Sequence, residues 1–378
     1  MSGSGPGDRQ VPFRDLARLV DDPEFAWREA LVAAVERAGF GRPSPATADV
    51  ERALARCCGT SDAVATASGS AALLLAMLGL GIGPGDEVVT VANTFAATVA
   101  AIVLLGATPV LVDVDRRSYT MDPDAFEAAI TPRTRLVVPV HLFGRLADMA
   151  AIGHVAGTHG ITVLEEACQA FGACRDGRMA GAFGDLAVFS FGPTKPVTGL
   201  GEGGAIVTSD AALAERLRLL NDHGKAGDDH RVVGLNFKMH PLEAAVLAER
   251  LRQPERWLRE RRAIAAAYNR ALGPLGCVHN PLAPTLDEHS YYVYVVEADD
   301  RAHCAAHLAR HGVATDVHYP RPVHRQTAYA GRVRYTDLAV TEAVGAKILS
   351  LPLINGLTGA EVAHVADVTG RYFADANG

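Results

Sequence analysis

Residues 184–208 read GDLAVFSFGPTKPVTGLGEGGAIVT, with one lysine between two apolar runs. The first run, Leu186–Phe191, ends in an alternating Phe-Ser-Phe and is typical of a buried strand. A second strand is predicted over Ala205–Thr208, and the prolines and glycines between the two runs interrupt regular structure. The stretch therefore predicts that Lys195 lies on a loop between two core strands.

Lys195 has two interpretations. A lone loop lysine is usually a solvated surface residue. The glycines and the apolar strands on both sides instead favour a buried lysine, because an exposed hairpin requires neither. Burial disfavours the charged ammonium and lowers the pKa of a lysine, so that its amine becomes a nucleophile toward carbonyl groups.

Two carboxylates precede this stretch. Residues 161–164 predict an apolar strand that ends in Glu165 and Glu166, and open α/β sheets bind ligands at the carboxyl ends of their strands. Pyridoxal phosphate requires an acid that keeps its pyridine nitrogen protonated and a lysine that holds its aldehyde as a Schiff base. Glu166 and Lys195 are candidates for these roles. The alternative is a solvated acid pair at a strand end. Because two adjacent acids cannot both face one nitrogen, Glu165 is expected to be the bystander of the two.

The run SFGPTKPVTGLGEGG, with EEACQA upstream, resembles the DegT/StrS-type nucleotide-sugar aminotransferases, which are fold-type I pyridoxal-phosphate enzymes. The resemblance extends from about Val11 to the C-terminus. It implies an α/β fold with a mostly parallel central sheet in a large domain and a small C-terminal α/β domain. It also implies that Lys195 forms the Schiff base, that Ser190 binds the cofactor phosphate and that Gln169 lies beside the ring.

Strands that alternate with helices through the first 210 residues indicate βαβ units and a mostly parallel sheet. We predict a disordered N-terminus at 1–10, a large cofactor-binding domain at 11–250 and a small domain at 251–378. A helical stretch over 241–272, with a break at Pro254, is expected to bridge the domains. After a linker at 273–284, the pattern predicts strands at 289–297 and 313–318 and helices at 300–311, 338–349 and 359–373.

The turn Ser68-Gly69-Ser70 comes between a predicted strand and a predicted helix. Backbone N–H groups and the helix dipole at such a turn can bind a phosphate, although an ordinary serine N-cap explains the same residues. The resemblance implies that Gly69 and Ser70 hold the cofactor phosphate, with Ser70 in place of the family's threonine. Phe95, at the start of the next helix, is either a core residue or the aromatic that stacks on the pyridine ring in the family.

Two positions depart from the family's pattern. Glu166 replaces an aspartate and is one methylene longer, so the ring or the strand end must shift to admit it. The run GLNFKM at 234–239 resembles the family's Gly-Tyr-Asn-Tyr-Arg-Met. By that resemblance Asn236 reaches the partner's cofactor phosphate, which implies an obligate homodimer with shared active sites. Lys238 replaces an arginine, and a point charge thus replaces a bidentate fork.

Several histidines are candidates for substrate contacts. The run HYPRPVH at 318–324 resembles a loop that faces the cleft in the family, and it makes His318, Tyr319 and His324 candidates. The alternative is a surface loop stiffened by prolines. His223 follows a predicted helix and is either a substrate contact or a plain loop histidine.

Composition excludes several classes of protein. The chain has 378 residues and a formal net charge of −7, which argues against nucleic acid as a partner. Six cysteines without a CxxC motif predict reduced thiols in a cytoplasmic protein, and no metal site is predicted. Neither a signal peptide nor a membrane-spanning run is expected.

These observations predict an aminotransferase that moves an amino group from glutamate or glutamine to a keto sugar, nucleotide-linked, or to a cyclitol ketone. Such a reaction serves secondary-metabolite or surface-sugar biosynthesis. Two alternatives stay open: another pyridoxal-phosphate reaction, such as that of a dehydratase or an aromatising synthase, and a non-catalytic partner subunit. Lys195 argues against the dehydratases, which carry histidine there, although Glu166 leaves that question open. The lysine, the serine and the ring acid are all retained, which argues against a non-catalytic subunit.

Overall fold

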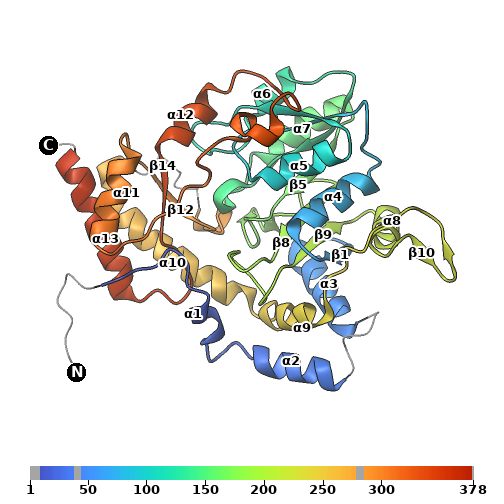
Figure 1. The fold of residues 1–378 in the computed structure, drawn as a ribbon, viewed down its shortest axis with the longest axis horizontal. Coiled ribbons are helices and arrows are strands. Elements are labelled where there is room, and N and C mark those ends of the chain that lie inside the picture. Colours follow the sequence, from blue (N-terminus) through green and yellow to red (C-terminus); the bar gives the residue numbers. More distant parts are fainter. Residues whose placement is uncertain (1–8, 38–43, 278–284, 377–378) are drawn as a thin grey trace.

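The computed structural model describes residues 9–37, 44–277 and 285–376 (Figure 1). Its centre is an eight-stranded sheet of order β1-β9-β8-β5-β4-β2-β3-β13. The strands, in that order, are Asp62–Thr66, Gly204–Thr208, Leu186–Ser190, Thr162–Glu166, Thr134–Val138, Glu87–Val91, Thr108–Val112 and Arg334–Tyr335.

The prediction of a mostly parallel sheet is confirmed. Strands β8, β5, β4, β2, β3 and β13 run parallel, and only β9 is antiparallel to its neighbours β8 and β1. The inner strands of the sheet are rich in buried apolar residues, as is typical of a sheet that is covered on both faces. Alternate residues of one strand accordingly enter different clusters: Phe189 packs with α3 and α9, whereas Val188 packs with α4 and α8.

Helices cover both faces of the sheet (Figure 1). They begin where the sequence offers caps; Asp210, for example, accepts hydrogen bonds from the backbone of Ala212 and Leu213 at the start of α8. The helices of this part are α1 (Ala17–Val20), α2 (Trp27–Glu36), α3 (Pro45–Cys58), α4 (Gly69–Gly79), α5 (Ala96–Leu104), α6 (Pro123–Ala128), α7 (Met149–His159), α8 (Ala211–Asn221) and α9 (Pro241–Arg250).

A second hydrophobic cluster lies beyond α10 (Pro254–Leu272), which starts at the predicted break. It contains β12 (Tyr294–Glu297), α11 (Arg301–Arg310), β14 (Ile348–Leu351) and α13 (Gly359–Ala376), and α12 (Ala339–Lys347) precedes β14. Val11 belongs to the same cluster, so the N-terminal segment packs on this part of the molecule. The division into domains at residue 250 stays a prediction.

Three predictions for this part are wrong. The strand at 289–297 starts only at Tyr294, because Tyr291 has a left-handed backbone and Arg261 binds the carbonyls of Tyr291 and Tyr292. Residues 313–318 form only isolated bridges. The second strand is instead β14, which pairs antiparallel with β12. The helix predicted over 338–349 ends at Lys347. The prediction is too long because a short apolar run such as ILSL fits a helix and a strand equally well.

The described part of the N-terminal segment starts at Arg9 and pairs with residues 312–314, and the predicted disorder of the N-terminus stays a prediction. Val11 N donates to Gly312 O at 2.8 Å, and Ala314 N donates to Val11 O at 3.1 Å. Residues 1–8 lie outside the described residues, as does most of the predicted linker, 278–284. Among the described helices, none combines the length and apolar character needed to cross a membrane.

Candidate active site

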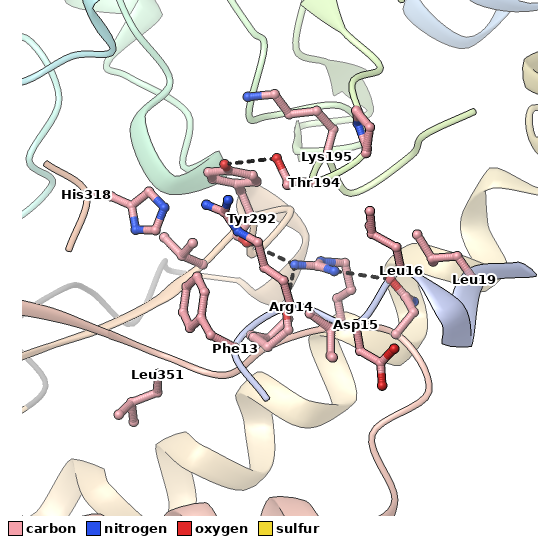
Figure 2. Close-up of a pocket in the computed structure, with 16 residues that line it drawn as sticks. Phe13, Arg14, Asp15, Leu16, Leu19, Thr194, Lys195, Tyr292, His318 and Leu351 are labelled. Atoms are coloured by element: carbon pink, nitrogen blue, oxygen red, sulfur yellow. Dashed lines mark hydrogen bonds between the residues drawn. The ribbon is translucent and has the colours of Figure 1, made fainter. Parts of the chain in front are cut away.

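A cavity of about 570 Å³ opens at the carboxyl ends of β5 and β8. It brings together most of the residues predicted from the sequence, namely Gly69, Ser70, Phe95, Glu166, Gln169, Ser190, Lys195, His318 and Tyr319. A smaller neighbouring pocket shares Lys195 and His318 with it and extends toward the N-terminal segment (Figure 2). The position of the cavity follows the rule that open α/β sheets bind ligands at their strand ends.

Lys195 lies on the predicted loop between β8 and β9, and it is half-buried rather than fully buried. Its Nζ lies 4.6 Å from the centre of the Tyr292 ring. The Tyr292 hydroxyl is 3.4 Å from Thr194 Oγ1, which fixes the floor of the pocket beneath the lysine (Figure 2). The amine is therefore directed into the cavity and accessible to a small ligand.

The loop that carries Lys195 is braced from α9. Glu243 Oε2 accepts a hydrogen bond from Gly201 N at 2.8 Å, and Arg250 Nε donates to Thr198 O at 3.2 Å. A Cβ on Gly199 would lie 1.7 Å from Glu243 Oε1. The glycine at 199 thus lets the Glu243 carboxylate approach the loop closely.

The start of α4 forms a cradle suited to a phosphate. Ser68 is the N-cap, and its Oγ accepts from Ala71 N at 3.1 Å. The first N–H groups of a helix have no partner within it, so those of Gly69 and Ser70 are available at the cavity wall. A Cβ on Gly69 would lie 2.7 Å from Ser190 Cβ, so only glycine lets the helix end approach the Ser190 hydroxyl.

Glu165 and Glu166 point to opposite faces of β5, and neither is the solvated acid considered above. Glu166 is only 4% exposed, lines the cavity and accepts a hydrogen bond from Cys168 N at 2.9 Å. Glu165 is fully buried away from the cavity, where it pairs with His141 Nε2 at 2.9 Å. Burial raises the pKa of Glu165, but His141 and the backbone N–H groups of Gly181 and Gly184 outweigh it and hold that pKa below its usual value.

Glu165→Gln is expected to lower the free energy of unfolding at neutral pH, and to lower it less at acidic pH. Because the pKa of Glu165 is lower in the folded state than its ordinary 4.5, its carboxylate stabilises the fold above about that pH and loses this effect as the pH falls. Urea unfolding at several pH values measures the effect. The difference in unfolding free energy between wild type and variant should shrink toward acidic pH; a difference independent of pH would contradict the assignment.

Aromatic residues close the cavity opposite the sheet. Gln169 Nε2 donates to the Tyr319 hydroxyl at 2.8 Å, and Gln169 Oε1 accepts from Phe143 N at 2.7 Å. Phe95 lies 5.7 Å from Tyr319 between ring centres and is 56% exposed, so it is not a core residue. Burial raises the pKa of Tyr319 well above its usual value, which keeps the phenol neutral.

His318 lines the cavity from the C-terminal part of the chain. It is buried, and its Nδ1 is 2.9 Å from Ser350 Oγ. Burial lowers its pKa to about 4, and nearby Arg14 and Lys195 act in the same direction. The imidazole is therefore neutral at physiological pH and can act as a hydrogen-bonding group rather than as a charge.

Four predicted residues do not line this cavity. His223 is exposed with a left-handed backbone, and His324 Nε2 pairs with Glu342 Oε1 at 2.9 Å. Lys238 forms an ion pair with Asp222, and Asn236 is exposed nearby on the same segment. Their proposed contacts with substrate or with a partner's cofactor stay predictions.

Three lining residues were missed in the sequence. Tyr292 was assigned only to a strand, and Asp316 to another. Arg14 lies in the N-terminal segment and reaches Asp316 Oδ2 at 3.4 Å. No local motif marks any of them, because each enters the cavity only through contacts between distant parts of the chain. In the part of the chain that the structure describes, no group of three His, Cys, Asp or Glu residues could hold a metal ion.

Comparison with known proteins identifies the family. Residues 26–369 match the sequence model of the DegT/DnrJ/EryC1/StrS aminotransferase family. The dTDP-3-amino-3,4,6-trideoxy-alpha-D-glucose transaminase of Streptomyces venezuelae is 39% identical over 365 residues, 96% of each chain. The solved structure of S. venezuelae DesV in complex with a ketimine intermediate has a TM-score of 0.91 at 37% identity and covers 96% of this chain and 98% of its own. NtdA of Bacillus subtilis, solved with bound cofactor PMP, has a TM-score of 0.88 at 30% identity. The match covers 97% of this chain and 87% of the NtdA chain.

These matches extend over both the sheet and the small C-terminal part, and they confirm the α/β fold of fold-type I predicted from the sequence. The chain therefore belongs to the DegT/DnrJ/EryC1/StrS aminotransferase family.

Proposed function

We propose that this protein uses pyridoxal phosphate to move an amino group from glutamate or glutamine to a nucleotide-linked keto sugar. The observation that carries the proposal is that Lys195 and the nearly buried Glu166 line one cavity together with the start of α4. Similarity to a dTDP-amino-sugar transaminase over 96% of both chains supports the sugar acceptor. A cyclitol ketone is the alternative acceptor.

The phosphate end of the cofactor fits the cradle at the start of α4. The N–H groups of Gly69 and Ser70 and the hydroxyl of Ser190 are donors, and the positive end of the helix dipole favours an anion. The close packing of Gly69 on Ser190 leaves this end of the cavity shaped for a small group held by backbone amides.

The ring end fits the remaining lining residues. A nearly buried carboxylate is costly without a positive partner, and a protonated pyridine nitrogen would supply one to Glu166. Phe95 offers an exposed ring face for stacking. When bound, the cofactor would supply an electron sink for charge that develops on the substrate carbon.

Lys195 has two tasks in this proposal. Its Nζ would hold the aldehyde end of a bound cofactor, and its amine would be free for proton transfer while a donor is bound. The freed amine then moves the proton at the donor's α-carbon, first as base and then as acid. Its position above Tyr292, on a loop braced by Glu243, keeps the amine within the cavity after displacement.

We also propose a homodimer with shared sites. Asn236 is exposed on a segment that also exposes the apolar side chains of Val233, at 95%, and Leu235. Exposed apolar side chains beside a polar candidate favour an interface between subunits. Asn236 would there reach the phosphate held by its partner's α4.

Asn236→Ala is expected to weaken cofactor retention by about tenfold, the loss of one hydrogen bond to a charged group. Mixing this variant with Lys195→Ala tests action across the interface. If Asn236 acts on the partner's site, mixed dimers regain one complete site and activity above either parent. If no mixture exceeds the parents although subunits exchange, the in-trans role is wrong.

The visible spectrum of the protein with pyridoxal phosphate, before and after L-glutamate or L-glutamine, tests the function as a whole. A yellow band that bleaches with a donor supports the first half of a transamination. A yellow band that neither donor changes would instead indicate another pyridoxal-phosphate reaction. A protein that forms no band would favour a non-catalytic subunit.

A further inference from the structure

The N-terminal segment carries Arg14 to the mouth of the cavity. The segment is anchored on both sides of this residue. Before it, Val11 exchanges backbone hydrogen bonds with Gly312 and Ala314. After it, Arg18 makes two hydrogen bonds to Glu361, at 2.7 and 3.0 Å. Arg14 thus belongs to a segment that long-range contacts hold beside the cavity, and not to a free chain end.

Arg14 lines both the cavity and the smaller pocket next to it, and it shares both with Thr194, Lys195 and His318. Figure 2 shows its side chain rising from the N-terminal segment toward Tyr292, beneath Lys195. Arg14 therefore lines the same cavity as the amine of Lys195, at which the amino group of a donor must react.

Few basic side chains line the cavity, and Arg14 is one of them. Among the described residues that line it, only Arg14 and Lys195 are arginine or lysine, whereas Glu166, Glu202 and Asp316 are acids. Burial holds the pKa of His318 at about 4, so it adds no positive charge at neutral pH. Lys195 is committed to the aldehyde in the proposed function. Among the described lining residues of this subunit, Arg14 is therefore the basic side chain left to pair with an anionic substrate group.

Replacing Asp316 by another carboxylate as the partner of Arg14 costs little free energy. Its guanidinium lies 3.4 Å from Asp316 Oδ2, and the two side chains are 48% and 46% exposed. Exposed ion pairs of this kind contribute little to stability. A carboxylate drawn into the cavity would replace Asp316 and could bind the planar guanidinium through two parallel hydrogen bonds.

We propose that Arg14 binds the α-carboxylate of the amino donor, and that Asp316 holds the guanidinium while the site is free. This inference rests on the proposed function. The α-carboxylate is attached to the same carbon as the reacting amine, so it must lie in the cavity that Lys195 and Arg14 line together. The proposal makes Arg14 a specificity-determining residue for amino acids over amines that lack an α-carboxylate.

The test follows the donor half-reaction spectroscopically in wild type, Arg14→Leu and Arg14→Lys, with L-glutamate, L-glutamine and the α-amide of L-glutamate. Arg14→Leu should raise the apparent dissociation constant for glutamate and for glutamine by about 10- to 100-fold, as expected for a lost hydrogen-bonded charge pair. The maximal rate should change much less. Preference for glutamate over its α-amide should fall by the same factor, and Arg14→Lys should lie between.

Arg371→Leu is the matched control, because Arg371 also forms an exposed ion pair, with Asp367 at 2.9 Å, but does not line the cavity. It should behave as wild type. Cofactor loading and thermal unfolding confirm that each variant is folded. If Arg14→Leu weakens the binding of glutamate alone, Arg14 contacts the distal carboxylate and the proposal is overturned. Wild-type dissociation constants for both donors in Arg14→Leu would overturn it as well. Failure of the wild type itself to bleach with either donor would overturn the proposed function instead.

Discussion

Replacing Lys195 by alanine is expected to abolish covalent attachment of pyridoxal phosphate and to slow the donor half-reaction by about 10⁴-fold. The variant loses both the amine that holds the aldehyde and the group that moves the α-proton. It should nevertheless fold normally. The loop is held by Glu243 and Arg250 through backbone groups, and the side chain of Lys195 is half-buried over Tyr292.

Borohydride reduction followed by peptide mass mapping measures the attachment. The other lysines of the chain, Lys225, Lys238 and Lys347, give an internal comparison. In the wild type the adduct should map to Lys195, and in Lys195→Ala no peptide should carry it. Lys225→Ala is the control, since this exposed residue does not line the cavity and its loss should change nothing. An adduct of wild-type yield in Lys195→Ala would refute the assignment.

Local backbone signals explain why much of the cavity could be predicted from the sequence. Gly69 follows a strand and opens a helix, Glu166 ends a strand, and Lys195 lies between two apolar runs. Each of these positions is fixed by an element a few residues long. Because parallel strands place their carboxyl ends at one edge of the sheet, such residues converge without any knowledge of long-range contacts.

Arg14 and Tyr292, which reach the cavity through tertiary contacts and carry no family motif, escaped prediction. Arg14 arrives there because Val11 pairs with residues 312–314, three hundred positions away, and no periodicity encodes that pairing. Tyr292 points at Lys195 because Arg261 binds backbone carbonyls beside it and bends the chain out of a strand. Similarly, Leu349 was assigned to a helix, and only its pairing with β12 makes it part of a strand.

Glu166→Gln is expected to slow the donor half-reaction by about 10²- to 4 × 10³-fold while covalent attachment to Lys195 persists. The substitution keeps the shape of the side chain and removes its charge. Loss of one partner from a buried charge pair costs about 3–5 kcal/mol, and each 1.4 kcal/mol is a factor of ten in rate. Single-turnover absorbance measurements with a saturating donor isolate this step from binding.

Two further variants sharpen the interpretation. Glu165→Gln changes the neighbouring acid on the opposite face of β5, so it should lower stability but leave the single-turnover rate near that of the wild type. Glu166→Asp restores the charge on a side chain one methylene shorter. It should lose less than the glutamine variant, because the charge remains although the Cys168 N–H, 2.9 Å from the present carboxylate, no longer fixes it in the same place.

The order of the single-turnover rates of wild type, Glu166→Asp and Glu166→Gln shows whether the charge or the length of the Glu166 side chain matters for the reaction. If charge is what the ring requires, the rates fall from glutamate to aspartate to glutamine, and Glu166 acts as the ring acid from a slightly displaced strand end. If the aspartate variant is as slow as the glutamine variant, the reach of the glutamate side chain matters as much as its charge. A glutamine variant as fast as the wild type would show that the nearly buried carboxylate of Glu166 has no part in the reaction, and the proposed role would then be wrong.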